Sequence, residues 1–389
     1  MNKKLGLAVA GALVAFSSAA NAGITIPAGD WTVDIGGNVN AYYTNVDSKV
    51  DGVESPKANT IGTGLLPAAF GIGAKTRQND LDIAFQFSFF TGTSSGNNAI
   101  DGGAAGNNTL NIRQAFLSFG DASWGTVKMG RDLGVFGSDA ILSDMTLLGV
   151  GVGGPAGGSS TLGRIGSGYI YADWKGQVQY ASPNWNGFQV TAALVENFRP
   201  FGTVSAGTQN TENLGYEGKA TYDFAANDVT GRVWLGGVSQ KTEGTANYTS
   251  NGVDVGAKVA YQGFGLVGYY YDGRGLDGQT VLGGLFNASG VKSKDSGGYV
   301  QATFAVPTIG TKLGASYGMS NSKNDANTFN IENESWIVGA YHPLTKSLNL
   351  VVEYTMQEIK NSGSLASTNN NKAAKTENDT VSLGAILFF

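Results

Sequence analysis

The sequence has no cysteine and a single histidine in 389 residues, and each absence excludes a class of site. Without cysteine the chain forms no disulfide, no thiolate metal site and no cysteine nucleophile. One imidazole, on His342, cannot build a histidine-rich metal centre or a relay of histidines. Only 14% of the residues are charged and the net charge is −5, so a nucleic-acid partner is not expected. We therefore expect no cofactor, no metal and no enzyme activity.

Long hydrophobic runs are also missing, except at the start of the chain. A basic start precedes an apolar run over residues 5–16, and Ala20-Asn21-Ala22 supplies a small-x-small cleavage site. This pattern predicts a secretory signal peptide over residues 1–22 and a mature chain of residues 23–389. No later run approaches the ~18 apolar residues of a membrane-spanning helix. The exported chain is therefore either soluble or inserted in a membrane as a closed β-barrel.

The sequence is rich in alternating patterns. Apolar residues occupy every second position of the segments 81–89, 253–261 and 348–356, and most of the positions between them are polar or small. A period of two indicates a strand with one apolar and one polar face. About ten residues suffice for such a strand to cross a bilayer at a tilt.

Segments of this kind recur through the whole mature chain, and we count sixteen of them. We expect strands at about 31–45, 65–76, 81–91, 110–120, 126–131, 168–181, 188–196, 214–224, 229–240, 252–261, 265–272, 298–306, 311–320, 333–341, 347–356 and 380–389. Short connections follow the even-numbered strands, and longer polar connections follow the odd-numbered ones. This alternation is typical of an up-and-down transmembrane barrel. The predicted fold is all-β, a sixteen-stranded antiparallel transmembrane β-barrel.

Aromatic residues lie near both ends of the predicted strands. We assign to the apolar face, near the short turns, Phe119, Tyr180, Tyr222, Tyr261, Phe304, Tyr341 and Phe389. At the other rim we place Tyr43, Phe89, Tyr271, Tyr317 and Tyr354. Two such series indicate the aromatic girdles found at the two surfaces of a membrane. The last strand alternates up to Phe389 and must pair with the first strand, because closure removes the exposed edges.

Several turns resemble those of one family. The run 177–188 (QVQYASPNWNGF) is similar to the Y-x-S-P-x-x-x-G-F hairpin of trimeric Gram-negative general porins, and 341–347 (YHPLTKS) is similar to their Y-x-L-S-K-R-T turn. Arg113-Gln114-Ala115-Phe116, followed by GTVKMGR at 125–131, resembles the hairpin that precedes their inward-folded third loop. These matches occur in the family's order along the chain.

The resemblance implies a homotrimer in the outer membrane of a Gram-negative bacterium. It also implies that the third long connection, about residues 132–167, folds into the lumen and narrows it. The acids of this loop, Asp132, Asp139 and Asp144, would then face basic residues of the wall. The aromatic end at Phe389 looks like the signal that such barrels present to the barrel assembly machinery.

Charges of both signs are expected on the inner face. Assigned by alternation, they are Asp34, Asp82, Lys128, Glu217, Lys219, Asp223, Arg232, Asp254, Lys258, Lys312 and Glu353. We place the basic side of the constriction at Arg113, Arg131 and Arg164, which border the hairpin and the loop that form it, with Lys128 on the adjoining wall. Arg131 shares its face with Met129, so an inward Arg131 requires a β-bulge near Gly130. Alternatively, these arginines only pin the loop to the wall by ion pairs.

The leading functional hypothesis is an outer-membrane porin for passive diffusion of ions and small hydrophilic solutes. A channel of the same architecture that prefers anions, such as carboxylates or phosphate, is the alternative, with Arg113, Arg131 and Arg164 as its binding ladder. A barrel lipase or protease and a soluble β lectin are two further possibilities. The single histidine argues against a catalytic triad of the serine-hydrolase kind.

Overall fold

The computed structural model describes residues 23–93, 110–153, 160–197, 213–242, 248–276, 292–324, 329–363 and 374–389. The predicted signal peptide, residues 1–22, lies outside these ranges. The described chain is almost entirely β-structure, with one short α-helix, α2 (Ser138–Ile141), and one 3-10 helix, η1 (Met145–Leu148). Neither of these helices has the length and apolar character that a membrane crossing needs.

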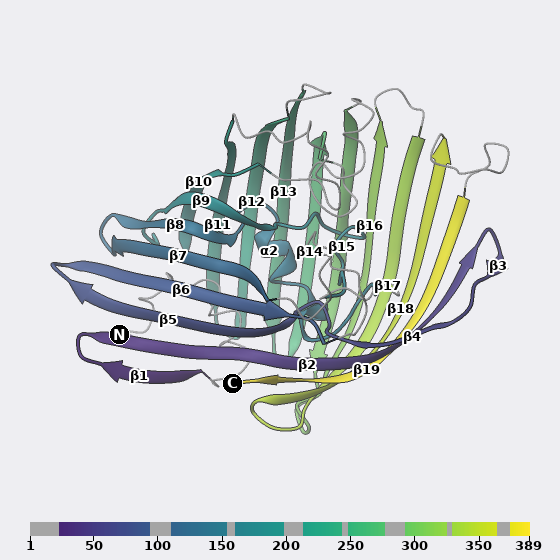
Figure 1. The fold of residues 1–389 in the computed structure, drawn as a ribbon, viewed down its shortest axis with the longest axis horizontal. Helices are drawn as coiled ribbons and strands as arrows, with labels where there is room; N and C mark the ends of the chain where they lie inside the picture. The colour runs from purple at the N-terminus through teal and green to yellow at the C-terminus, as the bar shows by residue number, and fades with distance from the viewer. Residues whose placement is uncertain are drawn as a thin grey trace.

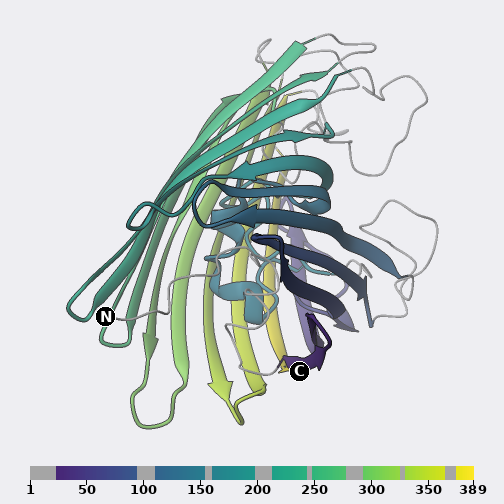
Figure 2. The ribbon, with the colours of Figure 1, turned by 90° about the vertical axis from the view of Figure 1, so that its left-hand side faces the viewer.

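Sixteen strands follow one another round a closed wall, each antiparallel to its neighbours (Figures 1 and 2). They are β2 (Trp31–Val50), β5 (Ala68–Gln78), β6 (Leu81–Thr91), β7 (Asn111–Asp121), β8 (Gly125–Leu133), β9 (Trp174–Ala181), β10 (Phe188–Val195), β11 (Gly215–Ala226), β12 (Val229–Thr242), β13 (Tyr248–Tyr261), β14 (Phe264–Arg274), β15 (Ser293–Ala305), β16 (Lys312–Asn324), β17 (Phe329–Pro343), β18 (Leu348–Gly363) and β19 (Ala374–Phe388). The predicted fold class is confirmed.

The barrel closes where β19 pairs with β2, from Phe388 opposite Asn38 to Thr376 opposite Val50. The end of the chain continues this ladder, since Gly37 N–H donates to Phe389 O at 2.9 Å. Beyond Phe389, the short strand β1 (Ile24–Ala28) pairs with the first residues of β2. Two more short strands, β3 (Val53–Glu54) and β4 (Ala58–Gly62), pair with its far part. The alternation did not predict these three short strands.

Alternation along each strand separates an exposed apolar outer face from a buried inner face. In β18, Leu350, Val352 and Met356 are 42%, 49% and 46% exposed, whereas Val351 and Glu353 between them are 2% and 1% exposed. The outer face thus presents large apolar side chains to hydrocarbon, as a membrane barrel requires.

Most girdle residues lie on the outer face as predicted, but two were assigned to the wrong side. Tyr180, Tyr222 and Tyr261 are exposed, whereas Tyr271 and Tyr341 are buried inside the barrel. The neighbour of Tyr271, Tyr270, takes the outer position. Alternation could not separate the faces at 269–271, because three consecutive tyrosines occupy both of them. The inner face is apolar there because a loop packs on it.

That loop connects β8 to β9, and its described parts, residues 134–153 and 160–173, run inside the barrel; we call it loop 3. It is longer at its end than the predicted 132–167, because β9 starts at Trp174 and not at 168. Tyr169, Ile170 and Ala172 lie in the segment that we expected to begin a strand, but all three are buried. They pack within the loop and against the wall, so they do not belong to strand β9.

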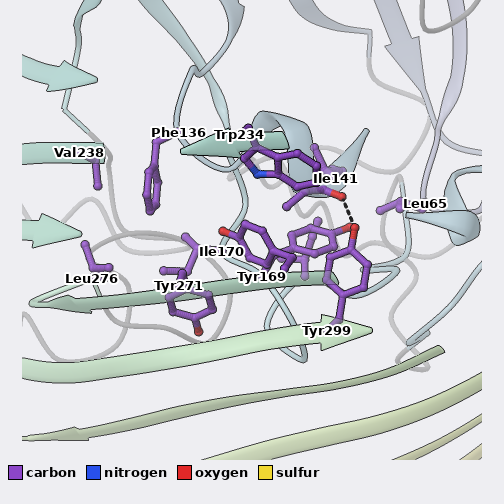
Figure 3. Packing of buried hydrophobic residues seen from close by; sticks show 13 residues of the cluster. Leu65, Phe136, Ile141, Tyr169, Ile170, Trp234, Val238, Tyr271, Leu276 and Tyr299 are labelled. Atoms are coloured by element: carbon purple, nitrogen blue, oxygen red, sulfur yellow. Dashed lines mark hydrogen bonds between the residues drawn. The ribbon is translucent and has the colours of Figure 1, made fainter. Parts of the chain in front are cut away.

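The apolar side of loop 3 packs against aromatic residues of the inner wall (Figure 3). The loop supplies Phe136, Ile141, Tyr169 and Ile170, and the wall supplies, from β12, β14 and β15, Trp234, Val238, Tyr269, Tyr271 and Tyr299. The hydroxyl of Tyr299 donates to Ala140 O at 2.8 Å. A second cluster joins Met145 and Val150 of the loop to β17, β18, β19 and β2. Loop 3 therefore lies along a large part of the wall.

Three carboxylates of the wall accept hydrogen bonds from backbone N–H groups of loop 3. Glu217 Oε2 accepts from Val135 N at 2.6 Å and from Phe136 N at 3.0 Å. Asp254 Oδ2 accepts from Gly137 N at 3.1 Å. Glu353 Oε2 accepts from Val150 N at 2.8 Å and from Gly151 N at 2.7 Å. A buried N–H without an acceptor is costly, so these carboxylates fix the loop inside the lumen.

Glycines on the wall make room for this close approach. A Cβ on Gly318 of β16 would lie 2.6 Å from Arg164 Nη1, and even closer to Ser167 O. A Cβ on Gly314 would lie 3.5 Å from Met145 Cε and closer still to its sulfur. At these positions a glycine therefore relieves crowding where loop 3 approaches the wall.

Replacing Glu353 by Ala should destabilise the barrel, because it removes the acceptor of two loop N–H groups and of the Tyr341 hydroxyl. Each buried donor left without a partner costs about 1–3 kcal/mol. Thermal unfolding in detergent should show a melting temperature lower by several degrees. The control is Glu358→Ala, on the outer face of the same strand; equal shifts for both variants would contradict the anchoring role.

Candidate pore constriction

An ion-pair network joins loop 3 to the wall at helix α2. Asp139 of α2 contacts Lys219 of β11, with 2.6 Å between Oδ2 and Nζ, and Arg232 of β12, with 2.9 Å between Oδ1 and Nη1. Arg232 also makes two bonds of 2.7 Å to Asp223. Bidentate pairing of this kind holds a guanidinium in one orientation. Asp139 of the loop thus pairs with two cations of the wall.

Asp139 is almost fully buried, yet it remains ionised. Burial by itself would raise the pKa of its carboxyl, but the cations of Lys219 and Arg232 outweigh that effect and hold the pKa below its ordinary value. At neutral pH the network therefore contains a fixed negative charge on the loop side and positive charges on the wall side.

Two further lysines of the inner wall form no ion pair with any described residue. Lys258 of β13 stands directly opposite Arg232 in the ladder. Lys312 of β16 lies with its Nζ 5.0 Å from the centroid of the Tyr341 ring. Both side chains are half-buried on the inner face. Together with Arg232 and Lys219 they form a set we call the basic wall.

Lys128 and Asp132 form an ion pair on the inner face of β8. Gln114 of β7 donates to Asp132 Oδ1 at 2.9 Å, and Gln177 of β9 donates to its backbone oxygen at 3.0 Å. Lys128 Nζ also lies 5.1 Å from the Phe116 ring centroid. These contacts place a matched pair of charges where loop 3 leaves the wall.

Asp144 and Arg164, in contrast, stabilise loop 3 from within. Asp144 Oδ2 accepts from the Tyr169 hydroxyl at 2.8 Å and from the backbone N of Arg164 at 3.2 Å. Arg164 is fully buried, and its guanidinium donates to Ser316 and Ser335 of the wall. Arg164 thus attaches the loop to β16 and β17 through hydroxyl groups rather than carboxylates.

The arginines of the predicted basic side are separated in the structure. Arg113 is buried at a bulge, where β7 gains one residue against Ser88 and Phe89 of β6, and its guanidinium lies 4.9 Å from the centroid of Phe90. Arg131 pairs in unbroken register and is exposed on the side of Met129.

The bulge required for an inward Arg131 is therefore not at Gly130, and the assignment of Arg131 to the constriction is corrected. Gly130 adopts a φ of 124°, but the ladder keeps its register through it. The bulge is at Arg113 instead. Lys219 and Arg232 are the two cations that pair with Asp139. From the sequence they were predicted only to lie on the inner face of the barrel. Their pairing with Asp139 depends on the path of the loop, which no local pattern specifies.

Nothing in the described ranges suggests a metal centre: they hold no group of three or more acids or histidines arranged to bind one. The candidate site consists instead of ion pairs and lysines of the inner wall beside loop 3.

Solved structures of several outer-membrane proteins share this fold. The outer membrane channel DcaP of Acinetobacter baumannii matches with a TM-score of 0.65 and 15% identity, over 95% of this chain and 100% of its own. OmpT of Vibrio cholerae matches with 0.59 and 15%, over 94% and 100%. OmpF of Salmonella typhi, in complex with daunomycin, matches with 0.58 and 14%, over 94% and 100%. At these identities the likeness shows the fold alone.

Comparison at the level of sequence gives the family. No curated protein sequence matches the chain. A family model described as Gram-negative porin, however, matches residues 8–362. This match extends over nearly the whole chain and agrees with the closed sixteen-stranded barrel. The chain therefore belongs to the Gram-negative porin family and is an outer-membrane channel.

Proposed function

We propose that the protein lets ions and small hydrophilic solutes diffuse passively through a hydrated lumen that loop 3 narrows. The observation that carries this proposal is the attachment of loop 3 inside the barrel, through Glu217, Asp254 and Glu353. A sixteen-stranded barrel is wide enough to hold water, whereas an eight-stranded one fills with side chains. Passage then depends on the remaining width and on the charges beside it.

The constriction of this proposal contains Asp139 with Lys219 and Arg232, the lone Lys258, and the pair Lys128 and Asp132. Asp144, Arg113 and Arg164 contribute to the constriction only by holding the loop and the wall in position. No chemical step is required of any side chain, so we propose that the protein is not an enzyme.

A preference for anions is a second candidate, and the basic wall favours it. Within the described part of the chain, Lys258 and Lys312 carry charges that no carboxylate neutralises by an ion pair. Such charges attract anions across confined water, where screening is weaker than in bulk salt. This candidate does not use the ladder of Arg113, Arg131 and Arg164, because the structure separates these three side chains.

We also propose a homotrimer whose subunits are inserted through the barrel assembly machinery, with Phe389 as part of the signal. The similar OmpT of Vibrio cholerae has been solved in a trimer form, with a TM-score of 0.54 to this chain. The apolar outer face of each barrel offers surface both to lipid and to neighbouring subunits. We propose in addition that residues 1–22 are removed on export.

Liposomes that contain the purified protein should admit small uncharged solutes at rates that fall steeply with solute size. The physical reason is that a fixed constriction sieves by diameter. Swelling rates for a series from glycerol to trisaccharides measure this dependence. Liposomes that remain impermeable to glycerol would contradict the diffusion pore.

Lys258→Gln should shift ion preference toward cations, whereas Arg131→Gln should leave it unchanged. The interaction energy of two unit charges about 4 Å apart is about 1 kcal/mol even in bulk water. This energy corresponds to roughly a fivefold change in the ratio of anion to cation permeability. Reversal potentials across planar bilayers under a salt gradient give this ratio. A shift for Arg131→Gln without one for Lys258→Gln would reverse the assignment made from the structure.

Chemical cross-linking of the protein in mild detergent should give a ladder that ends at three subunits, and conductance should rise in groups of three equal steps. These two measurements test the homotrimer. A ladder that stops at one or two subunits, with single steps, would refute it.

A further inference from the structure

Charges are segregated on four neighbouring strands, β17, β18, β19 and β2, at the end of the barrel that bears the long loops. On their outer faces lie Asp47, Lys49, Glu332, Glu334, Glu358, Lys360, Lys375, Glu377 and Asp379. On their inner faces, at the same level, lie Thr44, Val46, Ser48, Ile331, Asn333, Ser335, Thr355, Gln357, Ile359, Asn361, Thr376, Asn378, Thr380 and Ser382. This inner surface has many hydrogen-bonding groups and no ionisable side chain.

Contact with water alone does not explain why the outer faces of these strands are charged and the inner faces are not. At this level the outer face lies beyond the exposed aromatic residues Trp336 and Tyr354, so it meets head groups and water. The inner face borders the lumen. Both faces could carry charge, yet the inner one carries amides and hydroxyls. The basic wall shows that the same barrel does place charges on its inner face elsewhere.

Four of these inner residues form a continuous hydrogen-bonded row across the four strands, which we call the amide ladder. Gln357 Nε2 donates to Asn333 Oδ1 at 2.9 Å, and Asn378 Nδ2 donates to Gln357 Oε1 at 3.1 Å. Ser48 Oγ donates to Asn378 Oδ1 at 2.7 Å. Asn333 Nδ2 in turn donates to Gly166 O of loop 3 at 2.8 Å. The ladder therefore lies directly beside the loop that narrows the lumen.

The ladder retains hydrogen-bonding capacity toward the lumen. Each amide has two N–H groups and two lone pairs on its oxygen, and the row uses one donor and one acceptor of Gln357 and of Asn378. Gln357, Asn378 and Ser48 are half-buried, so their remaining groups can meet a solute. The row also fixes the orientation of each amide, which lowers the entropy lost on binding.

We propose that the amide ladder is a binding site for uncharged polyhydroxylated solutes, such as sugars and polyols, on the long-loop side of loop 3. Fixed neutral donors and acceptors replace the water around hydroxyl groups, and they give no advantage to either sign of charge. This inference rests on the proposed diffusion function and assigns it a solute class. An ion would find no partner charge on this surface.

The test uses raffinose, an uncharged trisaccharide, with the full-length protein. In planar bilayers, raffinose added on the long-loop side should reduce the ion current in a saturable way. Gln357→Leu and Asn378→Leu should each raise the half-blocking concentration about fivefold to tenfold, as loss of one or two hydrogen bonds implies. Ser48→Ala is a milder variant that keeps the fold, and Glu358→Gln, on the outer face of β18, is the matched control.

Each outcome decides the proposal. If raffinose does not block the wild-type current from the long-loop side, the ladder is not a sugar site. The same conclusion follows if raffinose half-blocks the ladder variants at the same concentration as it half-blocks Glu358→Gln. Lower melting temperatures with unchanged block would mean that the row only braces the wall. Titration calorimetry of the detergent-solubilised protein with raffinose measures the same binding without conduction. A protein that binds raffinose there but passes no current would overturn the diffusion function and leave the ladder site standing.

Discussion

The need to satisfy every buried backbone polar group determines this structure. In hydrocarbon an unpaired N–H or C=O is too costly to tolerate, so the strands must pair on both edges, and β19 must meet β2. The same requirement holds inside the barrel, where loop 3 runs through a crowded lumen with little regular structure of its own. Its N–H groups find acceptors in Glu217, Asp254 and Glu353 of the wall. Closure of the barrel and attachment of loop 3 to the inner wall thus have one cause.

This use of carboxylates changes the electrostatics beside loop 3. An acid whose oxygens accept backbone hydrogen bonds beneath a loop contributes less to the field in the open lumen than its position on the inner face suggests. Lys219 and Arg232 pair with Asp139 of the loop, whereas Lys258 forms no ion pair within the described residues. The balance beside the loop is therefore more positive than the net charge of −5 indicates. On the long-loop side, the inner faces of β17, β18, β19 and β2 carry amides and hydroxyls and no ionisable side chain among the described residues.

Most of the wall could be predicted from the sequence, because the period of two is local and lipid imposes it on every strand. The segment 81–91 was placed without error. The prediction failed where the inner face is also apolar: Tyr271 and Tyr341 contact loop 3 rather than a membrane surface, and 168–173 belongs to the loop. Arg131 was misplaced because the bulge lies at Arg113. The partners of Asp139 depend on contacts between residues far apart in the chain, which alternation does not encode.

Hydrogen–deuterium exchange of the detergent-solubilised protein tests the central claim most directly. Residues 135–137 and 150–151 belong to a loop, but their amides donate to buried wall carboxylates. The account predicts that these amides exchange as slowly as those of the neighbouring wall strands. Exchange as rapid as that of the exposed turn at 122–124 would show that loop 3 is not held in the lumen, and the constriction would have to be assigned elsewhere.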